Sequence, residues 1–288
     1  MATIYDLIVV IPVGPNETLE DLFDTIESVL YYTTRERRII LVDDSGKDTC
    51  IAVQAQIPDI DVVKTPHNNG GDGGLYLTLS LGYLHAHRNY TFKVLLKLDV
   101  DALVIGERPE KDAISFFARY PHLGLIGHYR FDTRPDPDDL HWSKTQLLQE
   151  ARRKSLLRDP ILCLSLRRLL RSARSNGFQP GDYVFGGSYF MSESCVRRLA
   201  VADLLSKKEL GRSLLQEDHI LGLLAKAAGI EMGDFVSGDL PMALEWKGLP
   251  CSPHELVARK KKITHSTRGW KDIGENEIRE FFRELRSP

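Results

Sequence analysis

The first 105 residues of the chain alternate between short apolar runs and stretches with a helical repeat. Apolar, β-branched runs occur at residues 7–13, 37–43, 60–64 and 92–106. Between the first two runs, leucine, isoleucine, valine and phenylalanine recur every three or four residues, which is the spacing of one face of an α-helix. Strands that alternate with helices of this length predict an α/β fold, in which a mostly parallel sheet has helices on both faces.

The second half of the chain is less regular. Residues 149–176 are basic and rich in leucine. Helical patterns follow at residues 194–205 and 217–229, and Gly229 is the predicted C-cap of the second helix. A last amphipathic helix is predicted near the end of the chain, with Asn276 as its N-cap.

Charge and hydropathy exclude several classes of protein. The formal net charge is −2, so no global field attracts the chain to nucleic acid. No apolar run approaches the ~18 residues of a membrane span, and the first residues lack the basic region of a signal peptide. The four cysteines have no CxxC pairing, which favours free thiols in a reducing compartment. We therefore expect a cytoplasmic protein that binds no nucleic acid.

The ends of the four predicted strands are polar or rich in glycine. They carry, in chain order, the segments PVGP, DDSG, HNNGGDGG and DVD. Ligands of open α/β sheets bind beyond the carboxyl ends of the strands. The four segments are therefore predicted to form one composite site.

Two carboxylates interrupt the most apolar of these runs. Residues two apart on a strand face the same way, so Asp99 and Asp101 are expected to point at one ion. Carboxylate oxygens suit a hard cation such as Mg²⁺ or Mn²⁺. The alternative is that one acid caps the next turn or pairs with a cation such as Lys97.

The second and third strand ends have features of a nucleotide site. Asp43 and Asp44 can accept a hydrogen bond from a ribose hydroxyl or a base imide, or form an Asx-turn. The glycines of residues 68–74 allow a ligand close to the backbone, next to a helix N-terminus that favours anions. A flexible loop is the alternative for that segment.

Two later segments carry further candidates. Glu217 and Asp218 begin a predicted helix, where they offer a general base or only complement the helix dipole. His265 lies close to Lys262 and Arg268, beside Lys260 and Lys261. These cations suit a diphosphate, and the imidazole can complete the coordination of a metal that bridges it.

In this order, the segments resemble GT-A fold glycosyltransferases, in particular the inverting family 2-like enzymes that use nucleoside-diphosphate sugars. The resemblance rests on VVIPVGPNETLEDLFDTIESVL, LVDDSG, HNNGGDGG, KLDVDALV, VFGGSYFMS, LQEDHILG and ITHSTRG. It covers nearly the whole chain and is strongest over residues 4–105. It implies a Rossmann-like GT-A fold with a smaller acceptor-binding part.

The resemblance also implies roles for individual residues. The implied metal ligands for Mn²⁺ or Mg²⁺ are Asp99, Asp101 and His265. The implied donor-binding residues are Pro12, Val13, Gly14, Asp43, Asp44, Asn69, Gly70, Gly71, Asp99, Lys262 and Arg268. The implied catalytic pair is Asp218, as base, with Glu217. The implied acceptor-binding residues are Gly186, Gly187, Ser188 and Trp270.

A single domain is expected over residues 1–288. Residues 1–105 form its nucleotide-sugar-binding half and residues 106–270 its acceptor-binding half, which contains the basic segment 149–176; residues 271–288 form the terminal helix. A UDP-sugar is the favoured donor, and the acceptor is a glycan, a lipid-linked molecule or a small molecule. No QxxRW motif follows the Glu-Asp pair, which argues against a processive polysaccharide synthase.

Other interpretations stay open. A nucleotidyltransferase shares such a sheet and its metal acids, but it usually has a basic residue in a glycine-rich loop after the first strand, and PVGPNETLED has none. A non-catalytic nucleotide-sugar-binding protein is the third class. The basic segment can contact a membrane surface peripherally, act as a lid over the donor, or form a solvated helical hairpin.

Overall fold

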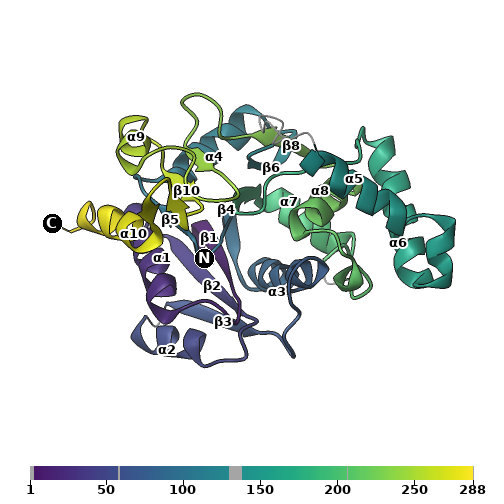
Figure 1. Cartoon of the computed structure of the whole chain (residues 1–288), viewed down its shortest axis with the longest axis horizontal. Helices are drawn as coiled ribbons and strands as arrows, with labels where there is room; N and C mark the ends of the chain where they lie inside the picture. The colour runs from purple at the N-terminus through teal and green to yellow at the C-terminus, as the bar shows by residue number, and fades with distance from the viewer. Residues whose placement is uncertain (1–2, 58, 130–137, 206, 288) are drawn as a thin grey trace.

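The computed structural model describes residues 3–57, 59–129, 138–205 and 207–287. In this part of the chain, the main sheet has seven strands in the order β3-β2-β1-β4-β7-β6-β8 (Figure 1). The strands are β1 (Ile4–Val13), β2 (Arg37–Asp43), β3 (Ile60–Lys64), β4 (Thr91–Leu98), β6 (Leu123–Gly127), β7 (Ser188–Ser192) and β8 (Glu231–Asp234). Only β7 pairs antiparallel with its neighbours, β4 and β6. The predicted α/β fold with a mostly parallel sheet is confirmed.

Helices cover both faces of this sheet, as Figure 1 shows. The helices are α1 (Leu19–Tyr32), α2 (Thr49–Gln56), α3 (Gly73–Asn89), α4 (Pro109–Arg119), α5 (Asp138–Glu150), α6 (Pro160–Ser175), α7 (Glu193–Val201), α8 (Glu217–Ala227), α9 (Pro253–Ala258) and α10 (Glu275–Glu284). The 3₁₀ turns are η1 (Arg153–Leu157) and η2 (Leu210–Arg212).

Strand β1 shows how the two faces divide the core. Ile8 and Val10 belong to a core with α3, α6, α7 and α8, whereas Leu7 and Val9 belong to a core with α1, α2 and α4. This follows from the alternation of side chains along a strand. Because both faces are buried, β1 reads as one continuous apolar run. Each fully buried aliphatic side chain contributes about 1.5–3 kcal/mol.

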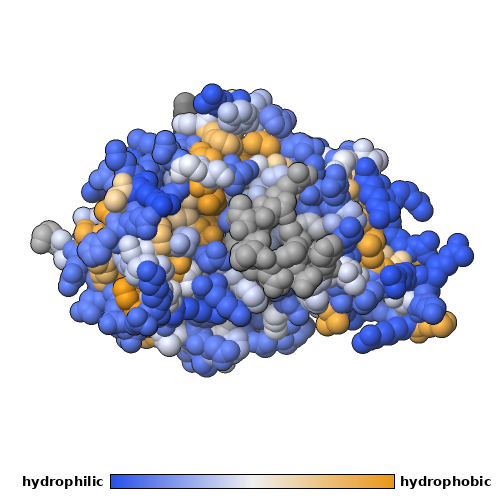
Figure 2. Space-filling model, turned by 45° about the horizontal axis from the view of Figure 1, so that its top comes forward, coloured by the Kyte–Doolittle hydropathy of each residue, from blue (hydrophilic) through white to orange (hydrophobic). Residues whose placement is uncertain are grey.

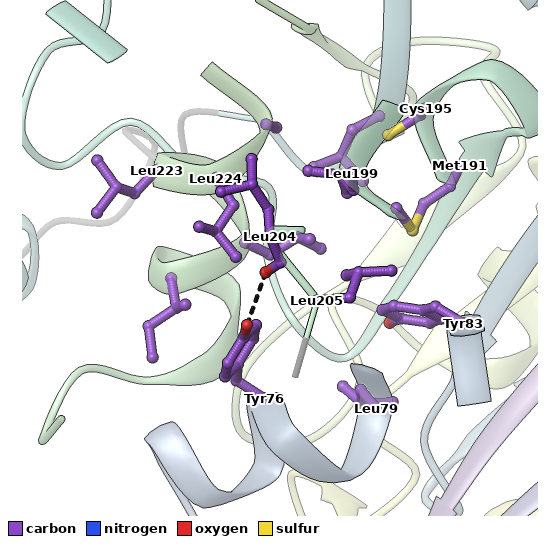
Figure 3. Close-up of a cluster of buried hydrophobic side chains, with 14 of the residues drawn as sticks. Tyr76, Leu79, Tyr83, Met191, Cys195, Leu199, Leu204, Leu205, Leu223 and Leu224 are labelled. Atoms are coloured by element: carbon purple, nitrogen blue, oxygen red, sulfur yellow. Dashed lines mark hydrogen bonds between the residues drawn. The ribbon is translucent and has the colours of Figure 1, made fainter. Parts of the chain in front are cut away.

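The first of these cores extends well beyond the sheet. Figure 3 shows Leu79 and Tyr83 of α3 close to side chains of β7, α7 and the residues that follow α7. The Tyr76 hydroxyl donates a hydrogen bond of 2.7 Å to the carbonyl of Leu204 in this cluster. The contact anchors the first turn of α3, which begins within the glycine-rich segment 68–74.

Helix ends follow local capping chemistry. Thr18, Asp159 and Ser192 each accept the backbone N–H three residues on, at the starts of α1, α6 and α7. Helix α8 ends one residue before the predicted position, because Ala228 is its C-cap. Gly229 follows with φ of +68°, and its N–H bonds to the third carbonyl before it. The predicted N-cap Asn276 is wrong, since α10 begins one residue earlier and Gly274 occupies the cap.

The predicted fourth strand over residues 92–106 is also wrong. The chain turns after β4, where the Ala102 N–H bonds to the Asp99 carbonyl at 3.0 Å. It then enters a second sheet as β5 (Ala102–Val104). This sheet has the order β5-β10-β9, with β9 (Met242–Leu244) and β10 (Ile263–His265). A two-stranded ribbon, β11 (Gly269–Trp270) and β12 (Ile273–Gly274), follows.

Because of this turn, Asp99 and Asp101 lie next to the second sheet, whereas a straight strand would continue along the main sheet. Register in the second sheet pairs His265 with Ala102, so the histidine lies beside the turn. Helix α10 holds the turn from the other side. The buried Arg279 donates to the Val100 carbonyl at 2.8 Å, and the Thr25 hydroxyl donates to the same oxygen at 2.6 Å.

Candidate active site

A cavity of about 500 Å³ lies at the carboxyl edge of the main sheet. It is lined by Pro12, Val13, Gly14, Pro15, Asn16, Glu17, Asp44, Asn68, Gly70, Gly71, Asp72, Leu75, Thr78, Asp99, Val100, Asp101, Phe185, Gly186, Gly187, Gln216, Glu217, Asp218, Trp246, His265 and Arg268. The four polar strand ends thus meet at one place. The segments before β7 and at the start of α8 close the cavity from the other half of the chain.

Asp99, Asp101 and His265 form a cluster that suits a metal ion. One ligand atom of each side chain lies within 4.8 Å of the others. The two acids do not lie on one strand, as the sequence suggested, but in the turn between β4 and β5. Two carboxylate oxygens and one imidazole nitrogen suit a divalent ion such as Mn²⁺, because imidazole favours transition metals over Mg²⁺.

The surroundings of His265 fix which ring nitrogen faces the acids. Its Nδ1 lies 2.8 Å from the carbonyl of Glu245, which can only accept, so Nδ1 carries the proton. Nε2 therefore faces the acids and lies 3.3 Å from Asp101 Oδ1, where a metal bound by both groups would take the place of a proton between these two atoms. A carbonyl that orients an imidazole in this way is typical of metal-ligating histidines.

Asp101 lies in a field that favours its charged form. Burial opposes ionisation, but hydrogen bonding and charge from His265, followed by the charge of Arg268, lower the pKa of Asp101. Arg268 Nε lies 2.8 Å from Asp101 Oδ2, and the Ser266 hydroxyl donates to the same oxygen at 2.9 Å. Asp101 is therefore available as an anionic ligand.

Asp99 has a different partner. Lys97 is fully buried, and its Nζ lies 2.7 Å from Asp99 Oδ1 and donates to the Gly186 carbonyl. Burial raises the pKa of Asp99, the charge of Lys97 opposes this, and Asp101 adds to it. Pairing with Lys97, the alternative weighed for one acid, therefore holds for Asp99 and leaves its second oxygen for an ion.

Glu217 and Asp218 lie side by side in the first turn of α8 but have different environments. Asp218 accepts the N–H of Gly186 at 3.0 Å and of His219 at 2.8 Å. Glu217 accepts the Tyr189 hydroxyl at 3.1 Å, and that hydroxyl lies 2.6 Å from the hydroxyl of Tyr83. Burial raises the pKa of Glu217 to about 8; Lys97 opposes this, and Asp218 and Asp99 add to it. Burial therefore favours the protonated form of Glu217.

Gly186 and Gly187 are required at their positions by close contacts. A Cβ on Gly187 would lie 2.4 Å from Nδ1 of His265. A Cβ on Gly186 would lie 2.8 Å from Oε2 of Glu217. The two glycines therefore let the start of α8 and the histidine approach the same backbone segment.

The structure distinguishes between the two acids after β2. Asp43 accepts the N–H and hydroxyl of Ser45, which is the Asx-turn alternative, and it does not line the cavity. Asp44 does line it, and its carboxylate accepts the Thr65 hydroxyl at 2.7 Å and the Asn69 N–H at 2.9 Å. Asp44 therefore ties the glycine-rich loop to the end of β2.

Four further residues that were predicted to bind donor or acceptor do not line the cavity. Lys262 faces α4, where its Nζ lies 2.5 Å from Asp112 Oδ2, so it is not available to a diphosphate in the cavity. Ser188 is buried, with its hydroxyl on the Lys97 carbonyl. Asn69 donates to Thr78 and lies behind the lining residues. Trp270 packs on the core beneath α9 and α10.

A second cavity of about 230 Å³ adjoins the first and was not predicted. It is lined by Trp142, Tyr183, Phe185, Gln216, Asp218, His219 and Trp246. Four of these residues, Asp218 among them, line both cavities. Trp246, rather than Trp270, is therefore the tryptophan at the main cavity.

Comparisons with solved structures identify the fold. The galactosyltransferase LgtC, in complex with donor and acceptor sugar analogues, matches 97% of this chain and 95% of its own, at 13% identity and a TM-score of 0.51. The bifunctional glycosyltransferase WbbM matches 98% of this chain and 49% of its own, at 9% identity and a TM-score of 0.51. A mannosyltransferase from Pyrobaculum calidifontis, in complex with GDP-Man and Mn²⁺, matches 67% of this chain and 46% of its own, at 16% identity and a TM-score of 0.40.

The chain spans about half of the length of the last two proteins. No protein-family model and no curated protein sequence matches the chain. The assignment therefore rests on the first two structures and on the sheet itself. Seven strands in this order, with a turn that leads to a second small sheet, give the protein the GT-A fold.

Proposed function

We propose that the protein is a metal-dependent glycosyltransferase that moves a sugar from a nucleoside-diphosphate sugar to an acceptor hydroxyl. The observation that carries this proposal is the meeting of the Asp99–Asp101–His265 cluster with Asp218 in one cavity. The fold supports it, since LgtC and WbbM are glycosyltransferases.

The donor would bind across the carboxyl edge of the sheet. The cluster would hold Mn²⁺, or less readily Mg²⁺, and the ion would offset negative charge on the departing diphosphate. Arg268, the cation among the described lining residues, would contact the diphosphate. Asp44 would accept from the ribose or from a base imide such as that of uracil, and Pro12, Val13 and Gly14 would lie along the base. A UDP-sugar is therefore our first choice of donor.

Asp218 is the proposed general base. Its carboxylate accepts two backbone N–H groups, which fix its orientation at the junction of the two cavities. It would take the proton of the acceptor hydroxyl as that oxygen attacks the anomeric carbon, with inversion. Glu217 would lie beside this base in its protonated form, so that it adds no second negative charge next to Asp218.

The acceptor would occupy the second cavity. Trp142, Tyr183, Phe185 and Trp246 offer aromatic surfaces on which a sugar ring can pack its apolar face. Asp218 lines this cavity too, so a hydroxyl group of an acceptor bound there would lie close to the proposed general base. The acceptor is thus a glycan or a small molecule that carries one.

Calorimetric titration of UDP, GDP and dTDP, with and without Mn²⁺, tests the donor site. We expect one nucleotide to bind in the presence of Mn²⁺ and to lose that binding in Asp101→Ala, because the variant removes an anionic ligand. Asp43→Ala is the matched control, since Asp43 lies outside the cavity. If no nucleotide binds to the folded wild type, or if binding is independent of metal and of Asp101, the donor site is refuted.

Replacing Trp246 with alanine should raise KM for the acceptor about tenfold, equivalent to ~1.4 kcal/mol of lost stacking, with little change in donor affinity. The reason is that Trp246 lines both cavities, so its removal takes away an aromatic surface for the acceptor. The side chain is 45% exposed, so its removal leaves no cavity in the hydrophobic core. Steady-state transfer kinetics measure the effect. An unchanged KM would place the acceptor elsewhere.

Donor hydrolysis separates the competing functions. A glycosyltransferase should release free sugar slowly without acceptor, whereas a non-catalytic binding protein should not. A nucleotidyltransferase should instead form pyrophosphate from a nucleoside triphosphate and a sugar phosphate. The segment from Pro12 to Glu17 has no basic residue for a triphosphate, which favours the transferase proposal.

A further inference from the structure

The region around the start of α6 exposes aliphatic side chains that the fold does not need. Leu157 at the end of η1 is 94% exposed, and Ile161 and Leu164 on α6 are 63% and 57% exposed. In Figure 1, α6 lies at the right-hand edge of the molecule. Figure 2 shows orange, apolar atoms among blue ones at that same end.

These residues are not the core face of the helix. Leu162, Leu166 and Leu169 of α6 are buried and pack in the core with α8. Ile161 and Leu164 lie on the opposite face, and Arg168 and Arg171 continue the same stripe at helical spacing. The solvent face of α6 therefore has an apolar end and a cationic end.

The surrounding charge is strongly positive. Residues 149–176 contain eight Lys or Arg and two Asp or Glu, in a chain whose net charge is −2. Arg152, Arg153, Lys154 and Arg158 flank the exposed leucine and are themselves exposed. Within the described residues, no carboxylate lies within 4.0 Å of these four cations or of the two arginines of the stripe, in contrast to Arg212, which pairs with Asp159 at 2.7 Å.

A cleft beside this stripe has the same mixed character. It has a volume of about 360 Å³ and lies between α5 and α6. Its walls are Leu148, Ala151, Arg167, Leu170, Arg171 and Arg174. Three guanidinium groups next to aliphatic side chains suit a phosphate group that is attached to an apolar chain.

We propose that this face, formed by η1 and α6, docks on a bilayer that contains anionic phospholipid. The exposed aliphatic side chains would enter the boundary between headgroups and acyl chains, and the cations would contact phosphates. Nucleic acid fits less well, because single-stranded sites use aromatic side chains for base stacking, whereas the exposed groups here are aliphatic. A helix that could span a bilayer is absent from the described part of the chain.

Vesicle co-sedimentation tests this inference, which is independent of the proposed activity. We expect the wild type to pellet with vesicles of phosphatidylcholine that contain about 30% phosphatidylglycerol, to pellet weakly with phosphatidylcholine alone, and to be released as salt rises. The double variant Arg168→Glu/Arg171→Glu should lower the partition coefficient at least about tenfold. The triple variant Leu157→Ser/Ile161→Ser/Leu164→Ser should lower it by a similar factor, because it removes the inserted groups.

Matched controls come from the other face of the sheet, which α1, α2 and α4 cover. Tyr31→Ser/Ile51→Ser changes exposed apolar residues on α1 and α2, and Arg35→Glu/Lys111→Glu reverses two exposed cations; neither should alter partition. All the replaced residues are exposed, so circular dichroism should show each variant folded. Equal binding to both vesicle types, or no loss in the serine variant, would overturn the proposal. Displacement by an oligonucleotide, with the serine variant still binding, would instead identify a nucleic-acid site.

Discussion

Replacing Asp218 with asparagine is expected to lower kcat/KM for sugar transfer about 10²–10⁴-fold, with the nucleotide affinity nearly unchanged. The amide keeps the shape of the side chain but cannot take a proton from the acceptor hydroxyl. Donor contacts are expected to survive, because Asp44 follows β2, and the metal cluster is formed by the turn before β5 and by β10, all outside α8. Transfer kinetics and nucleotide calorimetry on the same preparation measure the two quantities.

Glu217→Gln is the matched control for this prediction. Burial raises the pKa of Glu217 to about 8, so the wild-type side chain is already neutral at pH 7 and the amide resembles it. We expect the Gln variant to keep activity within about tenfold of wild type at pH 7, far above Asp218→Asn. If the loss were larger for Glu217→Gln than for Asp218→Asn, the assignment of the base to Asp218 would be wrong.

Replacing Asp24 with alanine is expected to lower the free energy of unfolding by about 3–5 kcal/mol. The Asp24 side chain is 1% exposed and contacts Arg279 at 2.9 Å, Arg283 at 3.4 Å and Arg286. Its removal would leave the guanidinium groups of Arg279 and Arg286 buried without this carboxylate, and the desolvation cost of those cations would remain. Urea unfolding, followed by circular dichroism, measures the difference.

Asp59→Ala is the control for the unfolding experiment. Its carboxylate is 99% exposed and lies 3.5 Å from Arg38, so its loss should cost no more than about 1 kcal/mol. Equal midpoints for Asp24→Ala and the wild type would show that the contact between α1 and α10 does not stabilise the fold.

The sheet and its functional edge could be predicted because they depend on local pattern. A run such as residues 7–13, buried on both faces, can only be apolar, and the polar residues after it must lie at the sheet edge. Hydrophobic periodicity and backbone direction contain this information without any knowledge of tertiary contacts. The meeting of His265 with Asp99 and Asp101 is different, because the resemblance to GT-A fold glycosyltransferases implied it and the local pattern did not.

The wrong predictions concern features that depend on tertiary contacts, namely which strands pair and which side chains face the cavity. The apolar residues on both sides of Asp99 and Asp101 gave no sign that the chain changes sheets there, because each flanking segment pairs with a strand from a distant part of the sequence. Lys262 and Arg268 are equally basic in the sequence, but only Arg268 faces the cavity. Lys97 and Trp246 lie beside residues that are far from them in the sequence, such as Gly186 for Lys97 and Phe185 for Trp246, and no local pattern reveals these contacts.

The hydrogen bond between Arg279 and the Val100 carbonyl has a consequence for biosynthesis. The two residues are 179 positions apart, and Val100 lies between the two acids of the metal cluster. At 5–20 residues per second, the ribosome needs about 10–35 s to make the arginine after the turn has been made. The nascent protein therefore completes this turn late, after most of the sheet strands have left the ribosome.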